Sequence, residues 1–384
     1  MIRYTIALSS WNNAAATITS LEFTDVPVPE GADAKDVSKS GDGSVMMWLT
    51  DDGKACHISS CREGIRTRVE NCSELFARMY ALEEISLGGL DTYGVTNMNI
   101  MFRYCRSLRE LDLSPLDTSS VTTMTFMLAD CDSLESVNLS GLDTSSLTDM
   151  TQMFMNSVSL KRVDLRGLDT SAVTKMYCTF KDCTGLEEVN LSGLDTGAVV
   201  KMTGMFAGCT SLEEIDLSGL DTSGVQEMGA MFNNCTSLKS LDLSGFDTGN
   251  VTTMSTMFCG CTSIRHIDLS GWDTRKVTTM SNMFSSCYEL EELDLSSFEM
   301  PVIERLDYMF YNSNALREIK VGSGFAFNGT ALYRVSLPTP DAASINVPAG
   351  CTVTGLWYNE SGTGFSPSEL PDFTAATYYA YCRS

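Results

Sequence analysis

The chain contains 384 residues and carries a formal net charge of −23, from 49 acidic and 26 basic side chains. Such acidity argues against binding to a nucleic-acid backbone, which needs Lys and Arg against phosphate, and it favours basic or cationic partners. Only two histidines occur, His57 and His266, so catalysis or metal binding that depends on histidine has little to draw on.

The N-terminal segment is predicted to contain a β-hairpin. The stretch "SVMMWLT-DDG-KACHIS", residues 44–59, has two apolar runs around an Asp-Gly turn signal. No run near the N-terminus is long enough for the core of a signal peptide, and no later run is long enough to span a membrane. A cytosolic chain, export by another route and loss of a leader all remain open at this point.

The middle of the chain is built from a repeat. A signature of Leu or an aromatic residue followed by Asp-Thr recurs every 26 residues, without insertion. The signature begins at Leu90, Leu116, Leu142, Leu168, Leu194, Leu220, Phe246 and Trp272. A fixed period of this length indicates stacked units, none of which buries its apolar face alone.

Each repeat divides into two halves. The stretch "SLEEIDLSGLDT" from Ser211 has the LxxLxLxxL spacing of the strand half of a leucine-rich repeat. The stretch "VTTMSTMFCGC" from Val251 has apolar residues on an arc of about 120°, which predicts a short helix. Asp247 and Thr248 precede it and are expected to cap the helix start, as Asp does from Asp91 through Asp273 in each repeat.

These features predict an α/β fold: a right-handed leucine-rich-repeat-like solenoid of about nine to ten strand–helix repeats with β-rich terminal caps. The expected domains are an N-terminal segment with its hairpin cap at 1–66, the solenoid at 67–325 and a C-terminal β-rich cap at 326–384. The hairpin is expected to cover the open edge of the first repeat.

The repeat resembles the BspA-like leucine-rich-repeat family, the 26-residue-repeat surface proteins and lipoproteins of bacteria. The resemblance rests on copies such as "LSGLDTSSLTDMTQMF" from Leu139 and spans about residues 69–322. The tail from Ser336, with "GLWYNESGTGFSPSELPDFTAATYYA", is similar to the closing segment of such proteins. The family implies an interaction or adhesion module at the cell surface or outside the cell, and not an enzyme. The chain departs from family habit in showing no export signal or lipobox.

Methionine and cysteine form columns in the second half of the repeat. Sixteen of the 22 methionines lie in two columns, Met98 through Met280 and Met101 through Met309. The cysteine column consists of Cys105, Cys131, Cys183, Cys209, Cys235, Cys261 and Cys287. Because Val and Phe share this face, the columns are interpreted as core, and no metal site or cofactor is predicted. The alternative is a soft-metal buffer that holds Cu(I).

Cys56–Cys61 and Cys351–Cys382 are weaker disulfide candidates.

Two columns of the strand half are predicted to point outward, because alternate residues of a strand lie on opposite faces. One column consists of Ser86, Asp112, Asn138, Asp164, Asn190, Asp216, Asp242, Asp268 and Asp294. The other consists of Glu84, Glu110, Ser136, Arg162, Glu188, Glu214, Ser240, His266 and Glu292. Like charges in such a stack repel one another.

Two interpretations of this face remain open. It is either a solvated acidic surface that keeps the protein soluble, or a concave surface for a basic protein or a glycan, with Ca²⁺ assistance as a variant. The candidate binding residues are Arg162, Asp164, Arg166, Glu188, Asn190, Glu214, Asp216, Asp242, His266 and Asp268.

The repeat around residues 157–183 departs most from the pattern. Ser157 replaces a column cysteine, and Arg162 and Arg166 flank Asp164 on the outward face. The two arginines either neutralise neighbouring carboxylates or fix the register of a bound partner, since Arg binds a carboxylate bidentately.

No catalytic motif is present: GxSxG, HExxH, a Walker loop and GxGxxG in a strand–turn–helix context are all missing from the sequence. The predicted function is therefore non-catalytic protein–protein or protein–glycan binding at a bacterial surface, with no nucleic-acid partner. The rival function is a rigid structural or receptor-binding component of a virion or secretion apparatus. The sequence does not indicate the ligand or the oligomeric state.

Overall fold

The structure is a computed structural model that describes residues 4–5, 17–325, 337–345, 347–348, 351–367 and 376–382. The chain divides into two compact units, each described by itself. The first unit consists of residues 1–173 and 182–194, and the second consists of residues 174–181 and 195–384.

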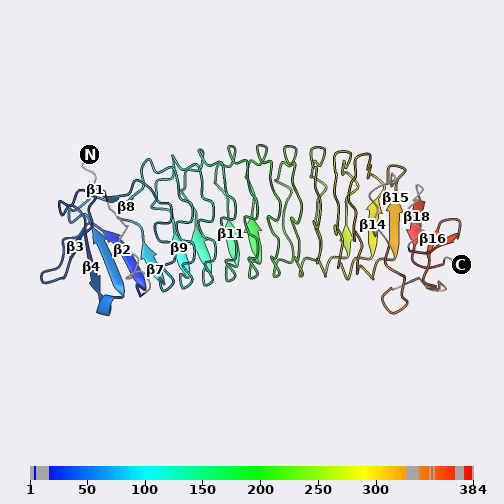
Figure 1. The fold of residues 1–384 in the computed structure, drawn as a ribbon, viewed down its shortest axis with the longest axis horizontal. Coiled ribbons are helices and arrows are strands. Elements are labelled where there is room, and N and C mark those ends of the chain that lie inside the picture. Colours follow the sequence, from blue (N-terminus) through cyan, green and yellow to red (C-terminus); the bar gives the residue numbers. More distant parts are fainter. Residues whose placement is uncertain are drawn as a thin grey trace. The chain divides into compact units, whose positions relative to one another are not determined.

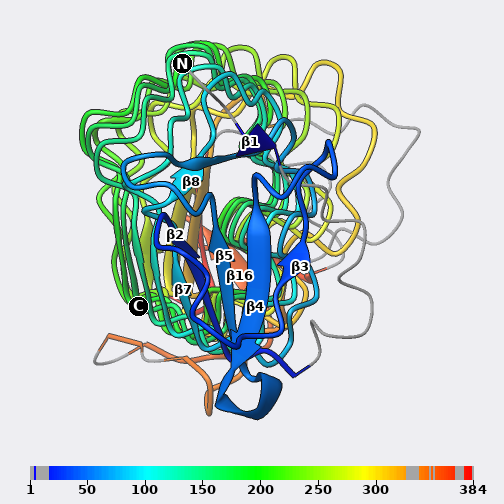
Figure 2. The ribbon, with the colours of Figure 1, turned by 90° about the vertical axis from the view of Figure 1, so that its left-hand side faces the viewer.

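A five-stranded sheet begins the first unit (Figure 2). Its order is β3 (Lys35–Asp36), β4 (Met46–Thr50), β5 (Ala55–Ser59), β2 (Ser20–Thr24) and β7 (Glu84–Ser86). The predicted hairpin is confirmed: β4 pairs antiparallel with β5 around a 3-10 turn, η1 (Asp51–Gly53). However, β2 and not the hairpin pairs with β7, the strand of the first repeat, and it buries Leu21 and Phe23. The hairpin therefore lies one strand further out than expected.

Short strands mark the first half of successive repeats (Figure 1). In the first unit these are β9 (Glu110–Asp112) with β10 (Ser136–Asn138), and β11 (Arg162–Asp164) with β12 (Glu188–Asn190), each pair parallel and offset by 26 residues. A separate parallel sheet joins β1 (Tyr4–Thr5), β6 (Thr67–Arg68) and β8 (Leu90–Asp91).

The second unit ends in a six-stranded sheet. Three repeat strands, β13 (His266–Ile267), β14 (Glu292–Leu295) and β15 (Glu318–Val321), pair parallel. Next to β15 in the sheet lies β18 (Ala376–Tyr379), which is antiparallel to it. The strands β16 (Trp357–Asn359) and β17 (Gly364–Phe365) follow in the order of the sheet. The edge of the last repeat strand is therefore covered by the C-terminal strand β18.

The predicted α/β fold, a right-handed solenoid of strand–helix repeats, is wrong. The described residues contain no α-helix, and their strands pair in several short sheets instead of one continuous sheet. The second half of each repeat is a series of tight turns. Its backbone enters the left-handed region twice, at positions four residues apart. These positions are Ile100 and Tyr104, Phe126 and Asp130, Gln152 and Asn156, Cys178 and Asp182, Gly204 and Gly208, Ala230 and Asn234, Thr256 and Gly260, Asn282 and Ser286, and Tyr308 and Asn312.

The hydrogen bonds explain why turns replace the helix. An α-helix satisfies each N–H with the carbonyl four residues earlier. Here alternate N–H groups leave the repeat: Ile100 N donates to Thr125 O at 2.9 Å, whereas Met101 N donates within its turn to Met98 O at 3.4 Å. The backbone of one repeat is therefore bonded to the next. The turns reproduce the three- and four-residue apolar spacing of a helix face, which misled the prediction.

The interior follows the predicted columns. The methionines of both columns and the seven column cysteines are at most 1% exposed, which confirms the core interpretation. In the second unit the phenylalanines stack along the repeats with ring centroids 5.6 to 6.0 Å apart. The stacked members are Phe180, Phe206, Phe232, Phe258, Phe284 and Phe310.

The column cysteines also act as hydrogen-bond donors. Each Sγ lies 3.0 to 3.2 Å from the backbone carbonyl of a residue in the preceding repeat, as Cys235 does with Phe206 O. Ser157 Oγ donates to Leu128 O at 2.7 Å, and Ser313 donates to Phe284 O. The serine at position 157 is therefore an equivalent donor and does not interrupt the pattern.

Buried threonines connect the repeats at a second level. Seven threonines of the Asp-Thr signature donate their hydroxyls to the backbone carbonyl 25 residues further on, at 2.7 to 3.0 Å. The donors observed are Thr92, Thr118, Thr144, Thr196, Thr222, Thr248 and Thr274. The expected helix-capping role of the signature is wrong, since no helix follows, and this threonine ladder was not predicted.

Candidate functional site

The exposed strand face of the first unit contains a group of acidic and basic side chains on β11 and β12. Along β11 and its continuation, Arg162, Asp164 and Arg166 are exposed, whereas Val163 and Leu165 are buried. The predicted common orientation of the three charged side chains is confirmed, because a strand alternates its side chains between faces.

These charges pair with one another. Arg166 binds Asp164 bidentately, with Nη2 2.7 Å from Oδ2 and Nε 3.0 Å from Oδ1. Arg162 Nε lies 3.5 Å from Oε2 of Glu188, which stands directly opposite it on β12. The hydrogen bonds from the Arg166 side chain hold the pKa of Asp164 below its usual value, and Asp164 in turn raises the pKa of Arg166.

Asn190 completes the group in the first unit. It lies in register with Asp164 on β12, and its Oδ1 accepts hydrogen bonds from Ser192 N at 3.0 Å and Ser192 Oγ at 2.7 Å. The structure therefore brings five of the predicted residues together on two adjacent strands: Arg162, Asp164, Arg166, Glu188 and Asn190.

In the second unit the predicted acidic residues occupy successive repeats. Glu214, Asp216, Asp242 and Asp268 are exposed. Asp216 accepts hydrogen bonds from Ser218 N at 3.0 Å and Ser218 Oγ at 2.7 Å. The pKa of Asp216 is lowered by these bonds, which outweigh the repulsion from neighbouring Asp242. The column is thus a series of Asx turns, and the expected repulsion is the smaller effect.

His266 lies in β13, opposite Glu292 of β14. Its Nδ1 is 4.0 Å from Glu292 Oε2, and its side chain is exposed. The histidine therefore lies beside one carboxylate on the strand face. Asp216 and Asp242 belong to earlier repeats of the chain.

Sequence reasoning missed a third charged column, just before each strand. In the second unit it forms ion pairs between Lys239 and Glu213 and between Arg317 and Glu291. The signal was present as charged residues of both signs at a 26-residue spacing: Glu213, Lys239, Arg265, Glu291 and Arg317.

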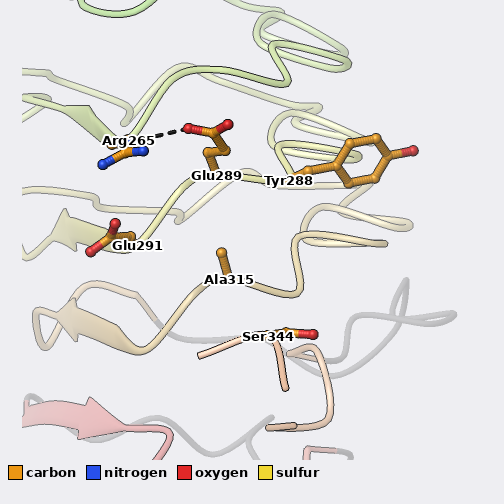
Figure 3. A pocket seen from close by; sticks show the side chains of 6 residues that line it. All are labelled: Arg265, Tyr288, Glu289, Glu291, Ala315 and Ser344. Carbon is orange, nitrogen blue, oxygen red and sulfur yellow. Dashed lines mark hydrogen bonds and ion pairs between the residues drawn. The ribbon is translucent and has the colours of Figure 1, made fainter. Parts of the chain in front are cut away.

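A small pocket of about 200 Å³ opens beside this column (Figure 3). Its lining residues are Arg265, Tyr288, Glu289, Glu291, Ala315 and Ser344. Arg265 Nε bonds Glu289 Oε2 at 3.1 Å, and Glu291 accepts from Arg317 at 3.2 Å. Both carboxylates therefore already have a guanidinium partner.

Among the described residues, no group of three or more His, Cys, Asp or Glu side chains is placed to hold a metal ion. None of the helices in the described part is long and apolar enough to cross a membrane. The described cysteines form no disulfide, so the structure gives no support to the Cys56–Cys61 and Cys351–Cys382 candidates.

Fold and surface together define a 26-residue-repeat protein with stacked turns, short parallel strands and an exposed, charged strand face. The chain belongs to the family described as "Mycoplasma protein of unknown function, DUF285", whose model matches residues 70–187, 158–242 and 239–321. The predicted resemblance to a bacterial repeat family is confirmed by this match, which ends where the repeat signature decays. No curated protein matches the chain.

Several solved structures are similar to the chain. A leucine-rich cell surface protein from Faecalibacterium prausnitzii A2-165 is 16% identical, with 77% of this chain and 95% of that chain covered and a TM-score of 0.37. A leucine-rich repeat protein from Eubacterium ventriosum ATCC 27560 is 15% identical, with coverages of 77% and 94% and a TM-score of 0.30. TLR13, in a complex with ssRNA13, is 18% identical with a TM-score of 0.29; the match covers 63% of this chain and only 36% of TLR13.

Proposed function

We propose that this chain is a non-catalytic interaction module that binds a protein or glycan partner through its exposed strand face. The observation that supports this most is the mixed-charge group at Arg162, Asp164, Arg166 and Glu188. The interior columns repeat with little change, whereas this exposed group departs from the Ser and Glu of neighbouring repeats.

Binding would proceed by exchange of ion pairs. Exposed pairs contribute only about 0–1 kcal/mol each, so a partner can displace them at little cost. The guanidinium groups of Arg162 and Arg166 then recognise carboxylates of the partner, and the released Asp164 and Glu188 accept its donors. A partner that presents both charges in the matching order is favoured over one that presents a single charge.

A binding role agrees better with the carboxylates than a catalytic role does. A general acid needs a raised pKa. The pKa values of Asp164, Asp216 and Asp242 are lowered, because Arg166, Ser218 and Ser244 donate hydrogen bonds to them. We place the module at the surface of a bacterial cell on the strength of the sequence resemblance.

The test is to restore the consensus at the two arginines with Arg162→Glu plus Arg166→Ser. We expect at least about tenfold weaker saturable binding to immobilised extracellular-matrix glycoproteins, with unchanged melting, since partner contacts are lost and weak surface pairs stabilise little.

Arg275→Ser is the matched control. Arg275 makes the same bidentate pair with Asp273, at 2.6 Å, but in the signature turn and not on the strand face. Equal binding by wild type and the double variant would refute the proposed site. Equal losses in the double variant and in Arg275→Ser would indicate a general charge effect instead.

A further inference from the structure

A ladder of alternating aromatic and arginine side chains lies on the turn half of the first unit. Its members come from three successive repeats: Tyr80, Arg103, Tyr104, Arg106 and Phe126. At the repeat position of Tyr104, the following repeats have only Asp, Asn, Gly or Ser. This surface is therefore a local exception to the repeat.

Two bulky members of the ladder lie at positions where every repeat has a left-handed backbone. Tyr104 has a φ of 66° and Phe126 a φ of 55°. The left-handed region suits Gly, Asn and Asp, and bulky side chains rarely adopt it. The equivalent positions of the other repeats adopt the same conformation, so the stacked turns enforce it here.

The rings and guanidinium groups stack in sequence. Arg103 Cζ lies 4.7 Å from the ring centroid of Tyr104 and 4.4 Å from that of Phe126. Arg106 Cζ lies 5.6 Å from the ring centroid of Tyr80 and 5.7 Å from that of Tyr104. These distances are within the range of cation–π attraction, so both guanidinium groups are restrained by the rings.

Arg103 and Arg106 differ in exposure and in the hydrogen bonds that their guanidinium groups donate. Arg103 is 23% exposed and donates to Asp130 Oδ2 at 2.8 Å, so its role is internal. The Arg106 side chain is 54% exposed, and its Nε is 3.5 Å from Asp132 Oδ2. Within the part of the chain that the structure describes, the Arg106 guanidinium donates no hydrogen bond, so its N–H groups are available to a ligand.

We propose that Tyr80, Arg106 and Asp132 form a binding site for a carboxylated sugar, such as a uronic or sialic acid residue. Arg106 binds the carboxylate with its fork of N–H donors. The ring of Tyr80, 45% exposed, supports the apolar face of the pyranose. Asp132, half-exposed beside Arg106, accepts a sugar hydroxyl.

The charge of the chain favours a sugar acid over an acidic peptide. At a net charge of −23, a peptide with several carboxylates meets long-range repulsion. A sugar acid brings one carboxylate and several hydroxyl donors, which matches one guanidinium that donates no hydrogen bond among the described residues next to one acceptor carboxylate. This site lies on the turn half and does not depend on the proposed strand-face function.

Ligand-observed NMR titrations of the full chain test the proposal. The probes are methyl glucuronide and N-acetylneuraminic acid, with methyl glucoside as the uncharged counterpart of the first. We expect at least one acid to bind saturably and methyl glucoside to bind about tenfold or more weakly, because it lacks the carboxylate. Arg106→Lys, which keeps the charge but not the fork, is expected to weaken binding of that acid about tenfold as well.

Tyr80→Ala should also weaken binding, and Tyr288→Ala is its matched control. Tyr288 occupies the same repeat position and is 53% exposed, but none of the described arginines lies over its ring. Unchanged melting of Arg106→Lys and Tyr80→Ala establishes that they fold.

Three results would overturn the proposal. The first is failure of both acids to bind, and the second is equal binding of methyl glucuronide and methyl glucoside. The third is a decrease as large in Tyr288→Ala as in Tyr80→Ala. Saturable, Arg106-dependent binding of an oligoglutamate peptide, without binding of either sugar acid, would assign the site to acidic proteins instead.

Discussion

Cys235 and Ser157 perform the same task in different repeats: each donates from a buried side chain to a backbone carbonyl of the preceding repeat, at 3.1 and 2.7 Å. The chain thus contains its own comparison of thiol and hydroxyl at one structural position. The position selects for a small side chain with a donor, because an unpaired buried carbonyl is costly.

Comparing Cys235→Ser with Cys235→Ala separates the contribution of the hydrogen bond to stability from that of side-chain burial. We expect Cys235→Ala to lower the free energy of unfolding by about 1–3 kcal/mol, since Phe206 O loses its partner. Cys235→Ser should cost less than about 1 kcal/mol, because the hydroxyl replaces the thiol as donor. Urea unfolding of both variants checks this, and an equal loss in both would show that the hydrogen bond contributes little.

The buried thiols also predict an alkaline limit to stability. Burial raises the pKa of Cys105, Cys183 and Cys235 from 9.0 to about 12. A raised folded-state pKa favours the folded state fully below the unfolded value, and this contribution declines as the pH rises above about 9. Urea unfolding should therefore show a lower free energy of unfolding at about pH 10.5 than at about pH 8. Replacing the three cysteines with serine should reduce this difference, because other buried thiols with a raised pKa, such as Cys56 and Cys72, remain. An unchanged pH dependence in that variant would assign it to other groups.

At the scale of the element, the sequence predicted burial better than backbone conformation. The Met and Cys columns were identified as core because apolar residues recur at one spacing, and their burial is confirmed. The helix was wrong, because left-handed residues such as Gln152, Ala230 and Thr256 carry no distinctive side chain in the sequence. The second of the two left-handed positions did give a signal, because Asn, Asp or Gly recurs there, as at Asn156, Gly208 and Asn234.

Asn234 tests the left-handed turn directly. Its φ is 58°, a value that suits Asn or Gly but not a β-branched residue. We expect Asn234→Val to lower the free energy of unfolding by about 1–2 kcal/mol, and Asn234→Gly to change it by less than about 0.5 kcal/mol. If the two variants were equally stable, or valine the more stable, a right-handed conformation at this position would be indicated.

The strand face was partly readable from sequence. Period-two alternation predicted the orientation of Arg162, Asp164 and Arg166, which is confirmed. The Asx turns of Asp216 and Asp242 were overlooked, although Asp followed by Ser two residues later repeats throughout. The ladder around Arg106 could not be predicted from the sequence, because its contacts join different columns and different repeats.

At the scale of the whole molecule, both ends of the repeat region are closed by strands from outside it. In the first unit β2 covers β7, and in the second unit β18 covers β15. An uncovered strand edge exposes unpaired N–H and C=O groups and invites association with other chains.

Deletion of residues 1–66 should therefore cause aggregation. The deletion removes β2 and leaves the edge of β7 and the apolar surface beneath Leu21 and Phe23 open to solvent. Size-exclusion chromatography with light scattering measures the outcome at several concentrations. A truncated chain that stays monomeric with unchanged melting would show that the N-terminal sheet is dispensable as a cap.

The most direct test of the proposed function is a hydrogen–deuterium exchange footprint of the full chain, free and saturated with the matrix glycoprotein that it binds most tightly. Recognition by the strand face predicts slower exchange confined to the peptides that contain residues 162–166 and 188–190, and loss of this protection in Arg162→Glu plus Arg166→Ser. Protection elsewhere, with these peptides unchanged, would contradict the account and assign partner binding to another surface.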